Sequence, residues 1–198
     1  RQKVDRRRPR SIDLGQSLPL EEVRLIPARP IDFPDTPGFG FPARFRVEAS
    51  DNTDFTSAAT ISDRTTTDFK NPGDTPVSFS ADKKVARFVR VTATQLWERT
   101  SDYVFALAEM QVFVTGTNVA LGTAVSALDS IETGNWSKKF LVDGFDSRRK
   151  LTRLLSVEES AEKDKLAAEV EAIVGKRRQL VDAMTDEATR TELARVTR

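Results

Sequence analysis

Hydrophobic and polar residues alternate along much of the chain before its last third. The alternation is cleanest at 44–50, where Phe45, Val47 and Ala49 are separated by Arg and Glu. Successive side chains of a strand point to opposite faces of the sheet. This segment therefore predicts a strand with one buried and one solvated face.

Apolar residues, with polar ones among them, are also frequent at 87–93 and 105–113. Both are rich in β-branched and aromatic residues, which suit a pleated, half-buried surface. The loop between them, 95–103, carries aromatic and charged side chains. Two rigid strands that present such a loop are a typical framework for a binding edge.

Turn-forming residues divide the rest of this region into short segments. Five of the nine prolines lie within 27–43, which predicts a long loop there because proline disfavours both a helix and a central strand. Gly15 predicts a turn between two strands within 11–26, and DKK at 82–84 predicts another turn. Short strands are also expected at 58–61 and 77–79. About seven short strands without a helical period predict a mainly β fold, an antiparallel β-sandwich or jelly roll.

The composition changes at about residue 149, after which Glu, Lys, Arg, Ala and Leu dominate. Residues spaced alternately by four and three form a heptad-like seam, which predicts a helical extension; they are Leu166, Val170, Ile173, Arg177, Leu180 and Met184. Gly175 ends or kinks this helix, and Ser156 with Glu159 has capping-box spacing. A helical hairpin and an intermolecular coiled coil are both compatible with the pattern. The expected domains are a basic, frayed end at 1–10, a sandwich at 11–148 and a helical extension at 149–198.

Composition excludes several kinds of chemistry. The chain has no Cys and no His, which excludes disulfides, Ser-His-Asp and Cys-His catalysis and the common zinc sites. A formal net charge of +1 indicates no nucleic-acid partner, and no apolar run approaches the ~20 residues of a membrane span. The chain begins with Arg and shows no signal peptide, so we expect a piece of a larger protein or a processed product.

Several stretches together resemble the discoidin, or coagulation-factor C-type, domains of the galactose-binding-like superfamily. They are IDLG at 12–15, EEVRLIPAR at 21–29, RFVRVTAT at 87–94 and ALAEMQVF at 106–113. A further piece resembles the opening segment of that family, namely NVALG at 118–122 with WSKKFLVDGFDS at 136–147. In the family this segment comes first, whereas here it follows the closing strand. Either the domain is circularly permuted, and 118–147 packs into the same sandwich, or the chain contains most of one domain and the start of another.

The resemblance implies a structural calcium ion at the LVDGFDS loop. The ligands carried over from the family are the carbonyl of Leu141 with Asp143, Asp146, Ser147 and Glu109. Calcium takes six to eight oxygen ligands, and a glycine permits the sharp turn that gathers them. The alternative is an ordinary turn capped by an aspartate, without metal.

Two groups of residues are candidates for a sugar site. Trp97, Arg99 and Tyr103 offer aromatic faces and a donor for hydroxyl groups, but the two aromatic rings also suit a plug at the end of the sandwich. On the Pro-rich loop, Arg29 and Asp32 form a second candidate edge. There the alternative is a staple through which Phe33 and Phe39 hold the loop down. Trp136 is expected in the core.

These features favour a non-catalytic module that binds carbohydrate or cell-surface glycans within a larger multidomain protein. The resemblance implies an extracellular, periplasmic or surface location, without direct membrane insertion. Paired carboxylates such as Asp32 with Asp35 do not differ from solvated charges, so glycoside hydrolysis is not expected. The alternatives are a structural module that forms homo-oligomers through the helix and a ligand-sensing ectodomain of a receptor.

Overall fold

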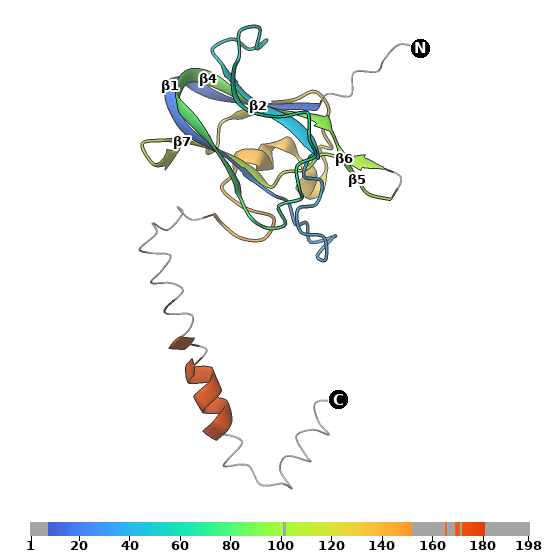
Figure 1. Cartoon of the computed structure of the whole chain (residues 1–198), viewed down its shortest axis with the longest axis vertical. Coiled ribbons are helices and arrows are strands. Elements are labelled where there is room, and N and C mark those ends of the chain that lie inside the picture. Colours follow the sequence, from blue (N-terminus) through green and yellow to red (C-terminus); the bar gives the residue numbers. More distant parts are fainter. Residues whose placement is uncertain (1–7, 101, 152–164, 166–168, 171, 181–198) are drawn as a thin grey trace. The chain divides into compact units, whose positions relative to one another are not determined.

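The computed structural model describes residues 8–100, 102–151, 165, 169–170 and 172–180 (Figure 1). The chain divides into two units, Arg1–Thr152 and Arg153–Arg198. The first unit is built from antiparallel strands, and a short helix in the second includes 172–180. The predicted mainly β fold with a C-terminal helix is therefore confirmed. Four predicted features lie outside the described residues: 1–7, the Ser156–Glu159 capping box, Leu166 and Met184.

Seven strands form one continuous antiparallel sheet in the order β3-β2-β4-β1-β7-β8, with β9 paired to β1. Their bounds are β1 (Arg8–Ile26), β2 (Arg44–Ser50), β3 (Ala59–Arg64), β4 (Val77–Gln95), β7 (Glu109–Val114), β8 (Thr117–Asn118) and β9 (Ala124–Ala127). A separate ribbon pairs β5 (Trp97–Glu98) with β6 (Tyr103–Val104), and two 3-10 turns follow β9, namely η1 (Gly134–Trp136) and η2 (Lys138–Val142). The loop expected at 95–103 is thus a short hairpin.

The strands β1 and β4 are each 19 residues long and curve side by side (Figure 1). The predictions of a turn at Gly15, of a turn at 82–84 and of a frayed end that includes Arg8–Arg10 were therefore wrong. Gly15 (φ 80°) and the pair Asp82 (φ 50°) and Lys83 (φ 56°) have left-handed backbone, and the register of β1 against β4 shifts near both places. These residues form bulges, which bend a strand without reversing it.

The bends fold the sheet over a single core. The first half of β1 pairs with β9, whereas its second half pairs with β7. The strand β1 therefore has a different neighbour on each side of its bend. Fully buried side chains from both halves and from β2, β4 and β7 meet inside; they include Ile12, Leu20, Val23, Leu25, Phe45, Val47, Val89, Val91, Met110 and Val112.

Residues 118–147 contribute to this same core, which is the first of the two alternatives offered for this segment. β9 pairs with β1 from Arg10 to Asp13, and Leu141 and Val142 of η2 are buried in the core. The side-chain oxygen of Asn118 accepts hydrogen bonds from the backbone N–H groups of Val112 and Ala120, both at 3.1 Å. The segment that resembles the opening of the family is therefore packed against the strand that resembles its end.

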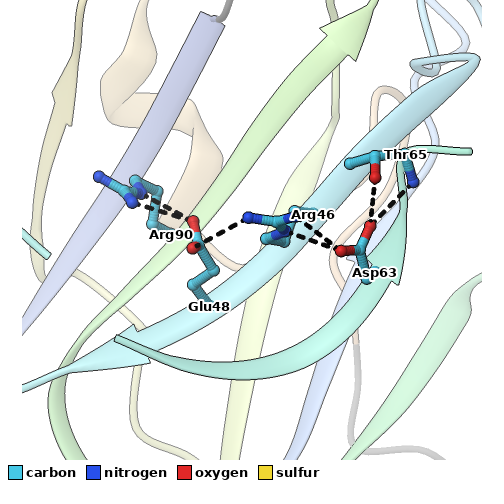
Figure 2. A network of polar contacts seen from close by, with 5 residues as sticks. All are labelled: Arg46, Glu48, Asp63, Thr65 and Arg90. Carbon is cyan, nitrogen blue, oxygen red and sulfur yellow. Dashed lines mark hydrogen bonds and ion pairs between the residues drawn. The ribbon is translucent and has the colours of Figure 1, made fainter. Parts of the chain in front are cut away.

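The outward face of β2 is polar, as its alternation predicts, and its bounds are the predicted ones. Figure 2 shows a chain of contacts across three strands, in which Arg90 bonds Glu48 at 2.9 Å and Arg46 bonds Asp63 at 2.7 Å. Arg46 lies 4.0 Å from Glu48 and connects the two pairs. The Arg46–Asp63 pair is exposed, and such pairs contribute only about 0–1 kcal/mol each, whereas Arg90 and Glu48 are partly buried.

The helix of the second unit is continuous across Gly175 over 172–180. Its apolar side chains are exposed, with Val170 at 55%, Ile173 at 65% and Leu180 at 63%. Among the described residues, no helix combines the length and the apolar character needed to cross a membrane.

Candidate functional site

A cavity of about 1050 Å³ opens where three loop regions of the first unit meet. The regions are the Pro-rich loop after β1, the segment from 96 to 108, and the segment from 129 to 147 that contains both 3-10 turns. Both apolar and charged side chains line it, among them Asp32, Arg99, Tyr103, Phe105, Ile131 and Asp143. A cavity of this size lies at the upper end of the usual range for small-ligand sites.

An aromatic cluster centred on Phe39 holds one wall of the cavity. Phe39 is 3% exposed and stacks on Phe33 with a centroid distance of 4.6 Å. The rings of Trp97 and Trp136 contact it at 5.3 and 5.7 Å. The cluster joins three segments that are distant in sequence, and it places Trp136 at the half-buried cavity wall rather than in the main core.

The three candidate residues on the β5–β6 hairpin, Trp97, Arg99 and Tyr103, have two different roles. Arg99 and Tyr103 line the cavity, and Tyr103 is 60% exposed. Arg99 makes a two-pronged ion pair with Asp102 at 2.7 and 3.2 Å, which fixes its guanidinium at the cavity wall. Trp97 is half-buried against Phe39, as a plug would be.

The two candidate residues on the Pro-rich loop, Arg29 and Asp32, also differ in role. Asp32 is exposed and lines the cavity. Arg29 instead fastens the loop, because it donates to the carbonyl of Pro34 at 2.8 Å and pairs with Asp74 at 2.7 Å. The contact between Phe33 and Phe39 is the staple that the sequence offered as the alternative.

The predicted calcium ligand Glu109 is fully buried at the start of β7. Its two carboxylate oxygens accept the backbone N–H groups of Asp143 at 3.1 Å and Gly144 at 3.0 Å. Burial raises the pKa of Glu109 from 4.5 to about 8, and the nearby charge of Asp143 also raises it, against the opposing effect of the two N–H donors. The described residues supply no cationic side chain in an ion pair with Glu109.

The other predicted side-chain ligands also have protein partners. The carboxylate of Asp143 accepts the N–H of Phe145 at 2.9 Å, as in the aspartate-capped turn offered as the alternative. Asp146 accepts the N–H groups of Arg148 and Arg149, both at 2.7 Å, and Ser147 accepts the N–H of Arg29 at 2.9 Å. In the described part of the chain, no three acidic side chains gather closely enough to hold a metal by themselves. Glu109 is a buried carboxylate with the charge of Asp143 nearby, a setting in which a bound divalent cation would be stabilising.

Arg10 lines the cavity but was not among the site residues predicted from the sequence. Its charge was assigned to a frayed basic end. The signal was the alternation itself, because Arg10 has the same parity as the buried Ile12 and Leu14 and therefore faces the same side of β1.

No family model matches the chain. No curated protein matches it either. Among solved structures, the chain is similar to the C-terminal domain of a chitobiase from Bacteroides fragilis, with 21% sequence identity and a TM-score of 0.36. The similarity covers 60% of this chain and 65% of that domain. At these values the likeness assigns neither a family nor a function.

Proposed function

We propose that this chain is a non-catalytic glycan-binding module of a larger protein that works outside the cytoplasm. The observation that carries the proposal is the cavity of about 1050 Å³, because it combines an exposed aromatic ring with polar groups, of which Arg99 is held by Asp102. Tyr103 offers a face on which the C–H surface of a sugar ring stacks, while Arg99 and Asp32 offer donors and acceptors for hydroxyl groups. The sequence resemblance to discoidin domains points in the same direction.

A structural calcium ion completes this proposal. Glu109 and Asp143 would hold it, and Asp143 lines the cavity. When bound, the ion supplies positive charge that neutralises the buried carboxylate and ties the loop after η2 to β7. Its expected role is therefore to stabilise one wall of the glycan site.

Replacing the two aromatic residues of the β5–β6 hairpin should separate binding from stability. Tyr103→Ala should weaken glycan binding by about 1 kcal/mol, roughly fivefold, and leave the melting temperature nearly unchanged, because the ring is exposed. Trp97→Ala should instead lower stability, because its ring packs on Phe39. The measurements are titration calorimetry against a glycan panel and thermal melts, with Tyr103→Phe as the control that keeps the ring. Wild-type protein that binds no glycan of the panel would refute the proposal.

A second candidate function is self-association through the helix, favoured by its exposed apolar residues. Ile173 and Leu180 belong to the heptad-like seam and are 65% and 63% exposed in the single chain. If two copies pair along this seam, sedimentation of the wild-type chain should show a dimer. Ile173→Asp should then give a monomer, whereas Lys176→Gln, at an exposed helical position outside the seam, should not. A wild-type monomer at high micromolar concentration would exclude this role.

A further inference from the structure

Arg10 is a largely buried cation in the wall of the cavity. Its side chain is 14% exposed, and its guanidinium carbon lies 5.1 Å from the centroid of Phe105, which also lines the cavity. Arginine has five N–H donors. Among the described residues, one hydrogen bond from Arg10 is formed, to the Pro9 carbonyl at 3.2 Å. Burial lowers the pKa of Arg10, with the charge of Asp129 acting in the opposite direction. A buried guanidinium with unused donors is suited to an anionic partner.

The groups around Arg10 show which anion fits. Asp129 pairs with Arg8 at 2.9 Å but reaches only to 3.9 Å from Arg10, and its side chain is 60% exposed. The carboxylate of Asp129 therefore lies near the Arg10 guanidinium but too far away to accept a hydrogen bond from it. Lys138 adds a further positive charge to the lining, and its own partner is Glu132 at 3.1 Å. The position therefore suits a carboxylate that enters from the cavity.

We propose that the preferred ligand is an acidic glycan, whose uronate carboxylate binds Arg10 in place of the weak contact with Asp129. This inference rests on the proposed glycan-binding function. The ring of the sugar lies in the cavity, and its carboxylate displaces the exposed Asp129 side chain from the guanidinium. A bidentate carboxylate contact adds both affinity and orientation.

The test compares matched neutral and acidic sugars by titration calorimetry of the full chain, using glucose with glucuronate and galactose with galacturonate. The acidic member of at least one pair should bind roughly tenfold more tightly or better, which is the range for a hydrogen-bonded charged group. Arg10→Gln should remove this preference while binding of the neutral member persists. Asp129→Asn should strengthen binding of the acidic member, because it removes the competing carboxylate. Arg64→Gln, at an exposed position on β3, is the control and should change neither.

Thermal melts accompany each variant, and Arg10→Lys provides a second variant that keeps the charge but loses the bidentate geometry. It should retain part of the preference, which a purely structural role would not produce. Equal affinity for the neutral and acidic members would overturn the inference and leave the proposed function standing. Absence of binding to every member of the panel would overturn both. A preference that survives in Arg10→Gln and in Arg10→Lys alike would assign the carboxylate to another residue and also overturn the inference.

Discussion

Calcium should raise the melting temperature of this protein at pH 8 by roughly 5–10 °C, and Glu109→Gln should abolish that response. A ligand that binds only the native state, at a concentration of about 100 times its dissociation constant, adds about 2.7 kcal/mol of stability. Glu109 is fully buried and has Asp143 beside it, so the ion relieves both the burial of a charge and the repulsion between two carboxylates. The measurement is a thermal melt in calcium and in chelator.

The pH dependence of the calcium-free protein gives an independent readout of the same carboxylate. The pKa of Glu109 is raised to about 8 in the folded state, against an ordinary value of 4.5. Between these values the folded chain holds a proton that the unfolded chain releases, so the free energy of unfolding falls as the pH rises. The contribution of Glu109 to the free energy of unfolding is fully present below about pH 4.5 and is lost as the pH passes 8. Its size is on the order of 4–5 kcal/mol.

Two variants make this prediction specific. Glu109→Gln should flatten the slope between pH 5 and 8 in chelator, while costing about 1–3 kcal/mol at low pH because one backbone N–H loses its acceptor. Glu98→Gln, at an exposed site on β5, should leave both the slope and the calcium response unchanged. Melts of the wild type that coincide in calcium and in chelator at pH 8 would contradict the calcium proposal. A slope that persists in Glu109→Gln would show that another group titrates.

Sequence reasoning found strand positions well where one face of a strand is wet. The bounds of β2 are the predicted ones because Phe45, Val47 and Ala49 alternate with charged residues. The predicted ends of β1 and β4 were wrong because a bulge and a turn have the same local sequence signals. Gly15 and the Asp82–Lys83 pair have the positive φ that a tight turn also needs. Pairing across the whole sheet decides between them, and this pairing is not a local property.

The candidate site was predictable in its parts rather than in its assembly. Glu109 and Asp143 were named from the resemblance, and the structure places them in direct contact through a backbone N–H. Trp97 was named both as a possible ligand contact and as a possible plug, and the structure places its ring against Phe39, as a plug would be. Whether a loop aromatic faces solvent or a neighbouring ring depends on contacts between distant segments, which periodicity does not report.

Phe39→Ala should cost roughly 3–5 kcal/mol of stability, the range for truncating a buried phenylalanine. For a domain of this size, that corresponds to a fall of roughly 6–20 °C in melting temperature. The reason is the position of the ring: it contacts Phe33, Trp97 and Trp136 and is 3% exposed. Its removal separates the Pro-rich loop from the β5–β6 hairpin and from η1, so the cavity wall should loosen and glycan affinity should fall together with stability.

Fluorescence can locate this effect within the chain. The protein has two tryptophans, and both contact Phe39, so their emission reports on the aromatic cluster. Phe39→Ala should shift the emission of the native state to longer wavelength, since both indoles gain contact with water. Phe39→Leu, which keeps most of the apolar volume, should recover much of the stability but not the aromatic contacts. Phe79→Ala is the matched control because Phe79 is a buried ring that packs on Phe45 elsewhere in the core. It should lower the melting temperature without changing native emission. A Phe39→Ala variant that loses less than about 1 kcal/mol, or keeps its wild-type emission, would show that the cavity wall is held by the backbone of its loops and not by this cluster.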